Sequence, residues 1–173
     1  MENKLETIIT NSLTINKEII KKEKIKIIID ELYKAILDNK DSLLSANKID
    51  IEKANGFELN FAIVEQIFKN IEKETIYCGD TIYSQKNNEK NFMYGKYYSS
   101  RGTILVINEG NTYILLELIL KNLITCNVLI INTSGYMYGT NNFIIHILQT
   151  ILEHNNYSKN QVQIYVSETP EEI

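Results

Sequence analysis

Hydrophobic residues recur at helical spacing through the first 75 residues. They lie three and four positions apart in two runs, Ile25, Ile28, Ile29, Leu32 and Ile36, then Phe57, Phe61, Val64, Phe68 and Ile71. This spacing gives each helix one apolar stripe and predicts a helical layer over residues 1–75. Asp41 is placed to cap a short helix through residues 43–44. The Asn55–Gly56 pair is a typical helix stop because glycine adopts the left-handed conformation freely.

Between residues 76 and 101 the pattern changes to turn residues and tyrosines. The turn signals Gly79–Asp80, Asn87–Asn88 and Gly95 separate short stretches such as 81–83 and 96–98. This alternation predicts a β-hairpin arm. Its tyrosines favour strands and, if exposed, would form an apolar patch that needs a partner. The tyrosines in question are Tyr83, Tyr94, Tyr97 and Tyr98.

Residues 102–173 alternate short apolar runs with helical stretches. The runs 103–107, 128–131 and 162–166 predict strands, and the intervening stretches predict helices from Thr112 to Thr125 and from Thr140 to His154. Strand-helix-strand order at this spacing implies parallel strands joined by right-handed crossovers. The strands are apolar throughout, which predicts a sheet covered on both faces, with the N-terminal helices as one cover.

The expected fold is therefore α/β and forms a single domain over residues 1–173. It consists of N-terminal helices, a β-hairpin arm and a half Rossmann-like parallel sheet of about three strands with flanking helices. A hydrophobic fraction of 44% and a charged fraction of 23% are typical of a globular chain that buries a sizeable core.

Charge and hydropathy narrow the choice of partners and location. A net charge of -4 and a pI near 5.3 provide no field that would attract nucleic acid. No apolar run is long enough for a membrane span, and the N-terminus lacks the apolar core of a signal peptide. We expect a cytoplasmic protein that binds neither nucleic acid nor membrane.

The cysteines and histidines give little sign of a reactive or metal centre. Cys78 and Cys126 are too few for a disulfide framework and lack zinc-site spacing, so both are expected as reduced thiols. Cys126 follows an apolar run and is expected to be a small buried hydrophobe. His146 and His154 lie eight apart without an acidic or cysteine partner at ligand spacing, so no metal site is predicted, and His146 is expected in the core or an interface.

The polar loops after the first two predicted strands are the candidate binding loops. In an open parallel sheet, ligands bind beyond the carboxyl ends of the strands, where helix N-termini offer free N–H groups. These loops are residues 108–111 and 132–135, both polar and each containing a glycine. Neither is a GxGxxG motif or a P-loop, so ordinary helix capping is the alternative explanation.

Two stretches resemble a known family. Residues 36–54, which contain Leu43-Leu44-Ser45-Ala46-Asn47 and Asp50, resemble the ILxANxxDxxxA pattern of γ-glutamyl phosphate reductase. The run Gly102-Thr-Ile-Leu-Val-Ile107, then Asn111, then residues 126–134 resemble the GVIxVI…N…GNxVILKxS course of the aldehyde dehydrogenase superfamily. The resemblance covers nearly the whole chain.

The resemblance implies the cofactor-binding part of that superfamily, with NADP or NAD as the cofactor. Asn111 would match the asparagine whose side-chain N–H helps hold the oxyanion. The nicotinamide side would be lined by Asn108, Glu109 and Gly110, and the adenosine side by Asn132, Thr133 and Ser134. The implied reaction is the NAD(P)-dependent interconversion of an aldehyde and an acid derivative.

This sequence also departs from the family pattern. Asn132 stands where the family usually has a lysine that grips the adenosine ribose, and losing such a charge-assisted bond costs roughly 1.5–3 kcal/mol. Arg101 and Cys126 replace the usual proline and glycine. The family's nucleophilic cysteine lies in a second domain, beyond the stretch matched here, and Cys126 does not match it. We therefore expect cofactor binding to be weak or vestigial.

Two functions follow as hypotheses. The first is a truncated, non-catalytic aldehyde dehydrogenase-like domain with a vestigial NAD(P) site, which forms a homo-oligomer through the hairpin arm. The alternative is the cofactor-binding half of an active NADP-dependent γ-glutamyl phosphate reductase or acylating aldehyde dehydrogenase. In that case the catalytic domain is on a separate chain or has been removed.

Overall fold

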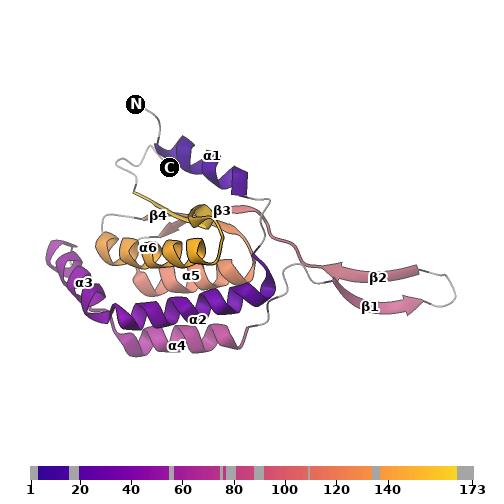
Figure 1. Cartoon of the computed structure of the whole chain (residues 1–173), viewed down its shortest axis with the longest axis horizontal. Coiled ribbons are helices and arrows are strands. Elements are labelled where there is room, and N and C mark those ends of the chain that lie inside the picture. The colour runs from indigo at the N-terminus through magenta and orange to yellow at the C-terminus, as the bar shows by residue number, and fades with distance from the viewer. Residues whose placement is uncertain are drawn as a thin grey trace.

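The computed structural model describes residues 4–15, 20–54, 57–74, 76, 81–87, 92–108, 110–133 and 137–166 (Figure 1). Four helices come first, followed by a two-stranded arm and then a parallel sheet whose strands alternate with helices. In chain order the elements are α1 (Lys4–Ile15), α2 (Lys22–Asp38), α3 (Lys40–Ala54), α4 (Phe61–Glu72), β1 (Thr81–Asn87), β2 (Phe92–Tyr97), β3 (Thr103–Asn108), α5 (Thr112–Ile124), β4 (Val128–Thr133), α6 (Tyr138–His154), η1 (Lys159–Gln161) and β5 (Val162–Tyr165).

The parallel sheet has the order β3-β4-β5, as the sequence predicts for a half Rossmann-like unit. Its register pairs Ile104 with Leu129 and Ile131 with Ile164. These residues belong to or pack against the main hydrophobic core. Because side chains alternate across a strand, this register directs one apolar face of all three strands toward the helices.

Helices cover the core face of the sheet in two layers (Figure 1). α5 and α6 follow β3 and β4, and α2 packs on both of them. α4 packs on α5, and α3 packs on α6 near one end of the layer. Leu32, Leu116 and Leu148, from α2, α5 and α6, are fully buried. Within the predicted N-terminal helical layer, α2, α3 and α4 therefore lie beneath the crossover helices, whereas α1 does not.

The opposite face of the sheet is only partly covered. Ile8 of α1 packs with Ile130 and Tyr165, so α1 covers β4 and β5. Leu105 and Ile107 of β3 lie on the same face and are 51% and 60% exposed. The expectation that both faces are covered is therefore wrong at β3, because α1 is the single helix on this face within the described ranges.

The hairpin arm projects away from the body of the molecule (Figure 1). β1 and β2 pair antiparallel, with a register shift between Tyr83 and Gln85. The predicted β-hairpin is confirmed. The signals Gly79–Asp80 and Asn88, and Cys78 beside them, lie outside the described residues, as do the side chains of both strands.

Two local predictions about the helical layer are wrong. Asp41 does not begin a short helix, because it lies in the first turn of a 15-residue α3 that begins at Lys40, directly after the C-cap Asn39 of α2. Phe57 lies outside a helix, since α4 begins at Phe61 and its N-cap is Asn60. The Asn60 side chain accepts a hydrogen bond from the N–H of Ala62 at 2.9 Å. A local Asx cap therefore fixes where α4 starts.

Asn47 of α3 holds the segment between α3 and α4 in place. Its Oδ1 accepts from the N–H of Leu59 at 2.8 Å, and its Nδ2 donates to the carbonyl of Phe57 at 3.1 Å. The Asn47 side chain is 1% exposed. One buried amide thus pairs both a donor and an acceptor of a non-helical backbone, which would otherwise be buried unsatisfied.

Replacing Asn47 with alanine should destabilise the fold substantially. Asn47→Ala leaves the Leu59 N–H and the Phe57 carbonyl without partners, and each unsatisfied buried group costs about 1–3 kcal/mol. We expect a loss of about 2–5 kcal/mol in the free energy of unfolding, measured by urea denaturation. Asn39→Ala is the control, because the Asn39 side chain is exposed and bonds only to Ala35 one turn earlier. Equal losses in the two variants would contradict this role.

Candidate functional site

The two candidate loops lie at the same end of the sheet, where the parallel strands finish. This end is called the carboxyl edge below. Asn108 ends β3 and Thr133 ends β4, and these two residues are register partners. Parallel strands place their carboxyl ends on one side, so the loops that lead into α5 and α6 begin next to each other. Of the sequence-predicted site residues, Glu109 and Ser134 lie outside the described residues.

Asn111 is the N-cap of α5. Its backbone is extended, with φ -73° and ψ 110°, and its Oδ1 accepts from the N–H groups of Tyr113 at 2.9 Å and Ile114 at 3.2 Å. The capping explanation therefore holds for this residue. Because the oxygen faces the helix, the Nδ2 points elsewhere, and it has no hydrogen-bond partner within the described ranges. A half-buried amide donor is thus oriented by its own cap.

Internal hydrogen bonds hold the loop before Asn111. Asn108 is 4% exposed, and its Nδ2 donates to the carbonyl of Asn111 at 3.3 Å. Gly110 has φ 96°, a conformation that glycine adopts without strain. Its carbonyl accepts from Nδ2 of Asn141 at 3.5 Å, and Oδ1 of Asn141 accepts from the Thr112 hydroxyl at 2.8 Å. This network links the starts of α5 and α6.

The described residues of the second loop lie in the interior. Asn132 is 4% exposed and Thr133 is fully buried, although the family resemblance assigns both to the adenosine side. Both make further polar interactions. A ligand at this edge would reach these two side chains only if the loop rearranged, whereas Asn111 is already half-exposed.

The N-terminus of α6 is capped by a carboxylate from a distant helix. The N-cap Met137 has no polar side-chain group for this role, and its φ is 55°. Asp50 of α3 takes its place: one oxygen accepts from the N–H of Gly139 at 3.1 Å, and the other accepts from the N–H and the hydroxyl of Thr140, both at 2.7 Å. These amides are the second and third of the helix, which an N-cap side chain normally pairs.

Sequence reasoning missed Asp50. Asp50 is 7% exposed, whereas Glu52, two residues further along the same helix, is exposed. The available signal was its position three residues after Asn47 in the ANxxD pattern, since positions i and i+3 share one helix face. Close approach also explains Gly139, where a Cβ would lie 3.0 Å from the Asp50 carboxylate.

Both helix N-termini at this edge are therefore closed by internal side chains. Asn111 pairs two amides of α5, and Asp50 pairs two amides of α6. Free amides at such positions are what normally hold a phosphate in an open parallel sheet. In addition, the Asp50 carboxylate brings a negative charge to the place where a phosphate would be attracted. The geometry is poorly suited to strong anion binding.

Cys126 lies at the opposite end of the strands, just before β4. It occupies the turn between α5 and β4 with φ 56° and packs against the main core as expected, but it is half-buried rather than buried. Its Sγ donates to the carbonyl of Ile20 at 3.7 Å. A strand rises about 3.3 Å per residue, so the six residues of β4 separate Cys126 from the Asn111 edge by roughly 15 Å or more. This thiol cannot attack a group held at Asn111.

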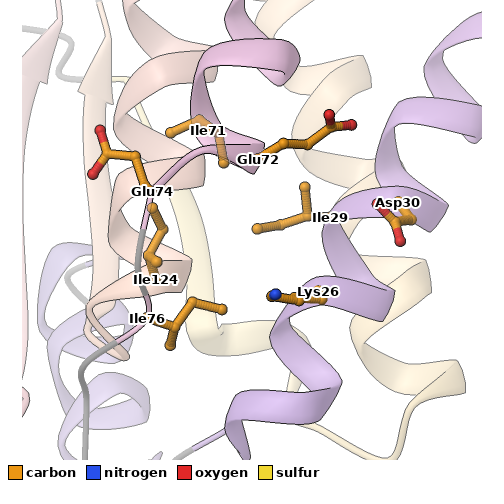
Figure 2. Close-up of a pocket in the computed structure, with 8 residues that line it drawn as sticks. All are labelled: Lys26, Ile29, Asp30, Ile71, Glu72, Glu74, Ile76 and Ile124. Carbon is orange, nitrogen blue, oxygen red and sulfur yellow. The ribbon is translucent and has the colours of Figure 1, made fainter.

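A small cavity of about 150 Å³ opens between α2, α4 and α5, away from the candidate loops (Figure 2). Four isoleucines and four charged residues line it. The carboxylates of Glu72 and Glu74 point in opposite directions and do not converge on a common point (Figure 2). The cavity offers no constellation for acid-base chemistry. Its lining residues are Lys26, Ile29, Asp30, Ile71, Glu72, Glu74, Ile76 and Ile124.

Two further expectations concern the positions of the histidines and the absence of a membrane span. His146 and His154 are both exposed on α6, so the expectation of a core His146 is wrong. Across the ranges that the structure describes, no three potential metal-binding side chains gather. None of the helices in those ranges is long and apolar enough to span a bilayer.

Solved structures with the same arrangement identify the fold. γ-Glutamyl phosphate reductase from Thermotoga maritima matches with a TM-score of 0.73 and 16% identity, over 84% of this chain and 38% of that chain. The same enzyme from Saccharomyces cerevisiae matches with a TM-score of 0.77 and 15% identity, over 98% and 48%. The chain has the fold of part of γ-glutamyl phosphate reductase.

AldH from Staphylococcus aureus, in a substrate-bound state, matches with a TM-score of 0.67 and 17% identity, over 98% of this chain and 37% of that chain. The chain thus spans less than half the length of each of these three structures. No protein-family model and no curated protein sequence matches it. The resemblance to γ-glutamyl phosphate reductase and aldehyde dehydrogenase that the sequence suggests is confirmed at the level of the fold.

Removing the Asp50 carboxylate should destabilise the first turn of α6. Asp50→Ala leaves the half-buried Gly139 amide and the buried Thr140 amide without this acceptor, and losing a helix cap costs about 1–2 kcal/mol, with more expected for a charged buried acceptor. We expect a lower melting temperature and faster hydrogen exchange at the first turn of α6. Glu52→Ala, an exposed carboxylate on the same helix, should change neither. Unchanged exchange at residues 139–140 in Asp50→Ala would rule the cap out.

Proposed function

We propose that this chain is an aldehyde dehydrogenase-like cofactor-binding domain that does not turn over substrate alone. The observation that supports it is the arrangement at the carboxyl edge. Asn111 is oriented as a donor there, while Cys126, the one cysteine in the described part of the chain, lies at the opposite edge. With no thiolate near Asn111 among the described residues, these residues would form neither a thiohemiacetal nor an acyl-enzyme.

NADP or NAD would bind weakly at this edge. Asn108, Glu109 and Gly110 would adjoin the nicotinamide, and Asn132, Thr133 and Ser134 the adenosine. The fit is poor for three reasons. Asn132 lacks the charge of the lysine that the family has there, two amides at each helix N-terminus are already paired, and Asp50 would repel a phosphate. The cofactor, when bound, would supply hydride chemistry, whereas these residues would only position it.

Asn111 would act as an oxyanion donor if a catalytic partner were present. Its Oδ1 is fixed by two backbone amides, which determines the direction of its Nδ2. A preorganised donor of this kind stabilises charge that develops on a carbonyl oxygen. The cap therefore gives Asn111 a defined orientation without any ligand.

A second candidate function is the cofactor-binding half of an active NADP-dependent γ-glutamyl phosphate reductase or acylating aldehyde dehydrogenase. Its support is that the chain spans 38–48% of the two matched γ-glutamyl phosphate reductases. A separate polypeptide, or a part of the protein beyond these residues, would then supply the cysteine.

Cofactor binding and turnover distinguish these functions. We expect calorimetric titration with NADP and NAD to give dissociation constants of roughly 100 µM or weaker, because losing 1.5–3 kcal/mol weakens binding about 10- to 150-fold. No aldehyde-dependent reduction of NAD(P) is expected, with an intact γ-glutamyl phosphate reductase as the positive control. Turnover by this chain alone would overturn the proposal.

If a cysteine-bearing catalytic domain restores turnover when added, Asn111 becomes testable in the mixture. Asn111→Ala should then lower kcat about 100-fold or more with a smaller effect on cofactor affinity, since the donor acts on the transition state. Asn132→Ala is the control at the same edge, and its effect should fall on cofactor affinity. A kcat unchanged in Asn111→Ala would exclude an oxyanion role.

We further propose that the hairpin arm mediates self-association. Its support is that β1 and β2 project from the body and carry Tyr83, Tyr94 and Tyr97 (Figure 1). An exposed two-stranded hairpin is marginally stable in isolation, so a partner surface would stabilise it. Light scattering should show a dimer that Tyr94→Ser weakens, and an unchanged dimer in that variant would remove the arm from the interface.

A further inference from the structure

We infer that the cavity between α2, α4 and α5 is a binding site for a short aliphatic carboxylate, separate from the carboxyl edge of the sheet. The cavity has a volume of about 150 Å³ and is lined by residues of all three helices and of the segment that follows α4 (Figure 2). An apolar cavity of this size holds a ligand about as large as a benzene ring. It is therefore large enough for a short branched acid and too small for a long acyl chain.

Four isoleucines give the cavity its apolar lining. Ile29 belongs to α2, Ile71 to α4 and Ile124 to the end of α5, while Ile76 lies shortly after α4. Each of them is at most 6% exposed and belongs to the main hydrophobic core. Because aliphatic side chains neither donate nor accept hydrogen bonds, the part of a ligand that lies among them must be a hydrocarbon.

Lys26 is the one cation among the described residues that line the cavity. Its side chain extends from α2 toward Ile76, so that the Nζ points into the space between the isoleucines (Figure 2). Within the described part of the chain this ammonium makes no hydrogen bond and no ion pair. It can therefore pair with the carboxylate of a ligand whose hydrocarbon part occupies the cavity.

The carboxylates that line the cavity do not point into it. Those of Asp30, Glu72 and Glu74 are directed away from the space that the Lys26 ammonium enters (Figure 2). Three carboxylates against one ammonium leave a net charge of -2, which by itself favours a cationic ligand. However, water screens charges that point into solvent, so the charged group inside the cavity dominates at contact distance. A carboxylate ligand is favoured over an ammonium, although the surrounding charge limits its affinity.

The methyl resonances of the lining isoleucines provide a direct test by NMR. We expect 3-methylbutanoate at millimolar concentrations to shift the δ1-methyl signals of these four residues saturably. Ile49 of α3, which is 51% exposed, is the internal control and should not respond. Acetate, which has the charge without the hydrocarbon, should bind more weakly, and so should 3-methylbutylamine, which has the opposite charge. No saturable shift with 3-methylbutanoate, or tighter binding of the amine or of acetate, would overturn the inference.

A methionine at position 26 isolates the role of the ammonium, because it keeps a flexible aliphatic stem. Lys26→Met should weaken 3-methylbutanoate binding about 3- to 10-fold, a moderate loss because Lys26 is exposed and water weakens its ion pairs. The neutral alcohol 3-methylbutanol should bind this variant as well as it binds the wild-type chain. Lys34→Met is the matched control, since Lys34 is also exposed on α2 but does not line the cavity. Equal affinities of Lys26→Met and the wild-type chain for the acid would overturn the carboxylate assignment.

The cavity and the carboxyl edge can be tested independently in the same samples. None of the residues that line the cavity belongs to the candidate cofactor loops. Lys26→Met should therefore leave the NADP titration unchanged, and NADP should leave the four isoleucine signals in place. NADP that shifts these signals and is displaced by 3-methylbutanoate would overturn a separate site. Failure of cofactor binding alone would contradict the proposed function and leave the inference about the cavity intact.

Discussion

The buried carboxylate of Asp50 joins the helical layer to the carboxyl edge of the sheet. Removing a carboxylate from water costs several kcal/mol unless hydrogen bonds and a favourable field replace its hydration. Here the amides of Gly139 and Thr140, the Thr140 hydroxyl and the positive end of α6 provide both. α3 and α6 must therefore form and pack together, because neither tolerates losing the other at this point.

Asn47 extends this dependence by one turn of α3. Its amide holds the backbone before α4, and α4 in turn packs on α5, which Asn111 caps. A series of polar contacts and helix packing thus connects α3 to both candidate loops. Hydrophobic packing alone would allow helices to slide, whereas paired polar groups in the interior allow one arrangement. The position of the candidate site follows from residues far from it in the sequence.

Local patterns predicted the elements whose periodicity is strong. The strands around 103–107 and 128–131 and the two crossover helices were expected within two residues of their observed ends, because continuous apolar runs leave few alternatives. Asn111 was expected at a loop after a strand and proves to be a local cap. The helix boundary at Lys40 was not foreseen, because α3 follows the C-cap of α2 with no intervening turn.

The contacts that no local pattern encodes were missed. Asp50 meets α6 across 89 and 90 positions of the sequence, so no pattern within α3 alone indicates this contact. The same limitation applies to β3, whose apolar composition indicated burial on both faces although α1 reaches only as far as β4. Periodicity in the sequence indicates which side chains favour burial, but the tertiary arrangement decides which of them are buried.

Capping also sets the relation between stability and binding at this edge. A helix N-terminus can pair its amides with an internal side chain or offer them to a ligand, but the same amide cannot do both fully. At α5 an uncharged asparagine takes this position and keeps one amide group available. At α6 the Asp50 carboxylate takes this position, and its negative charge would repel a phosphate. An edge organised in this way holds its own structure together without a ligand, and any anionic group that binds there must compete with contacts on which the fold depends.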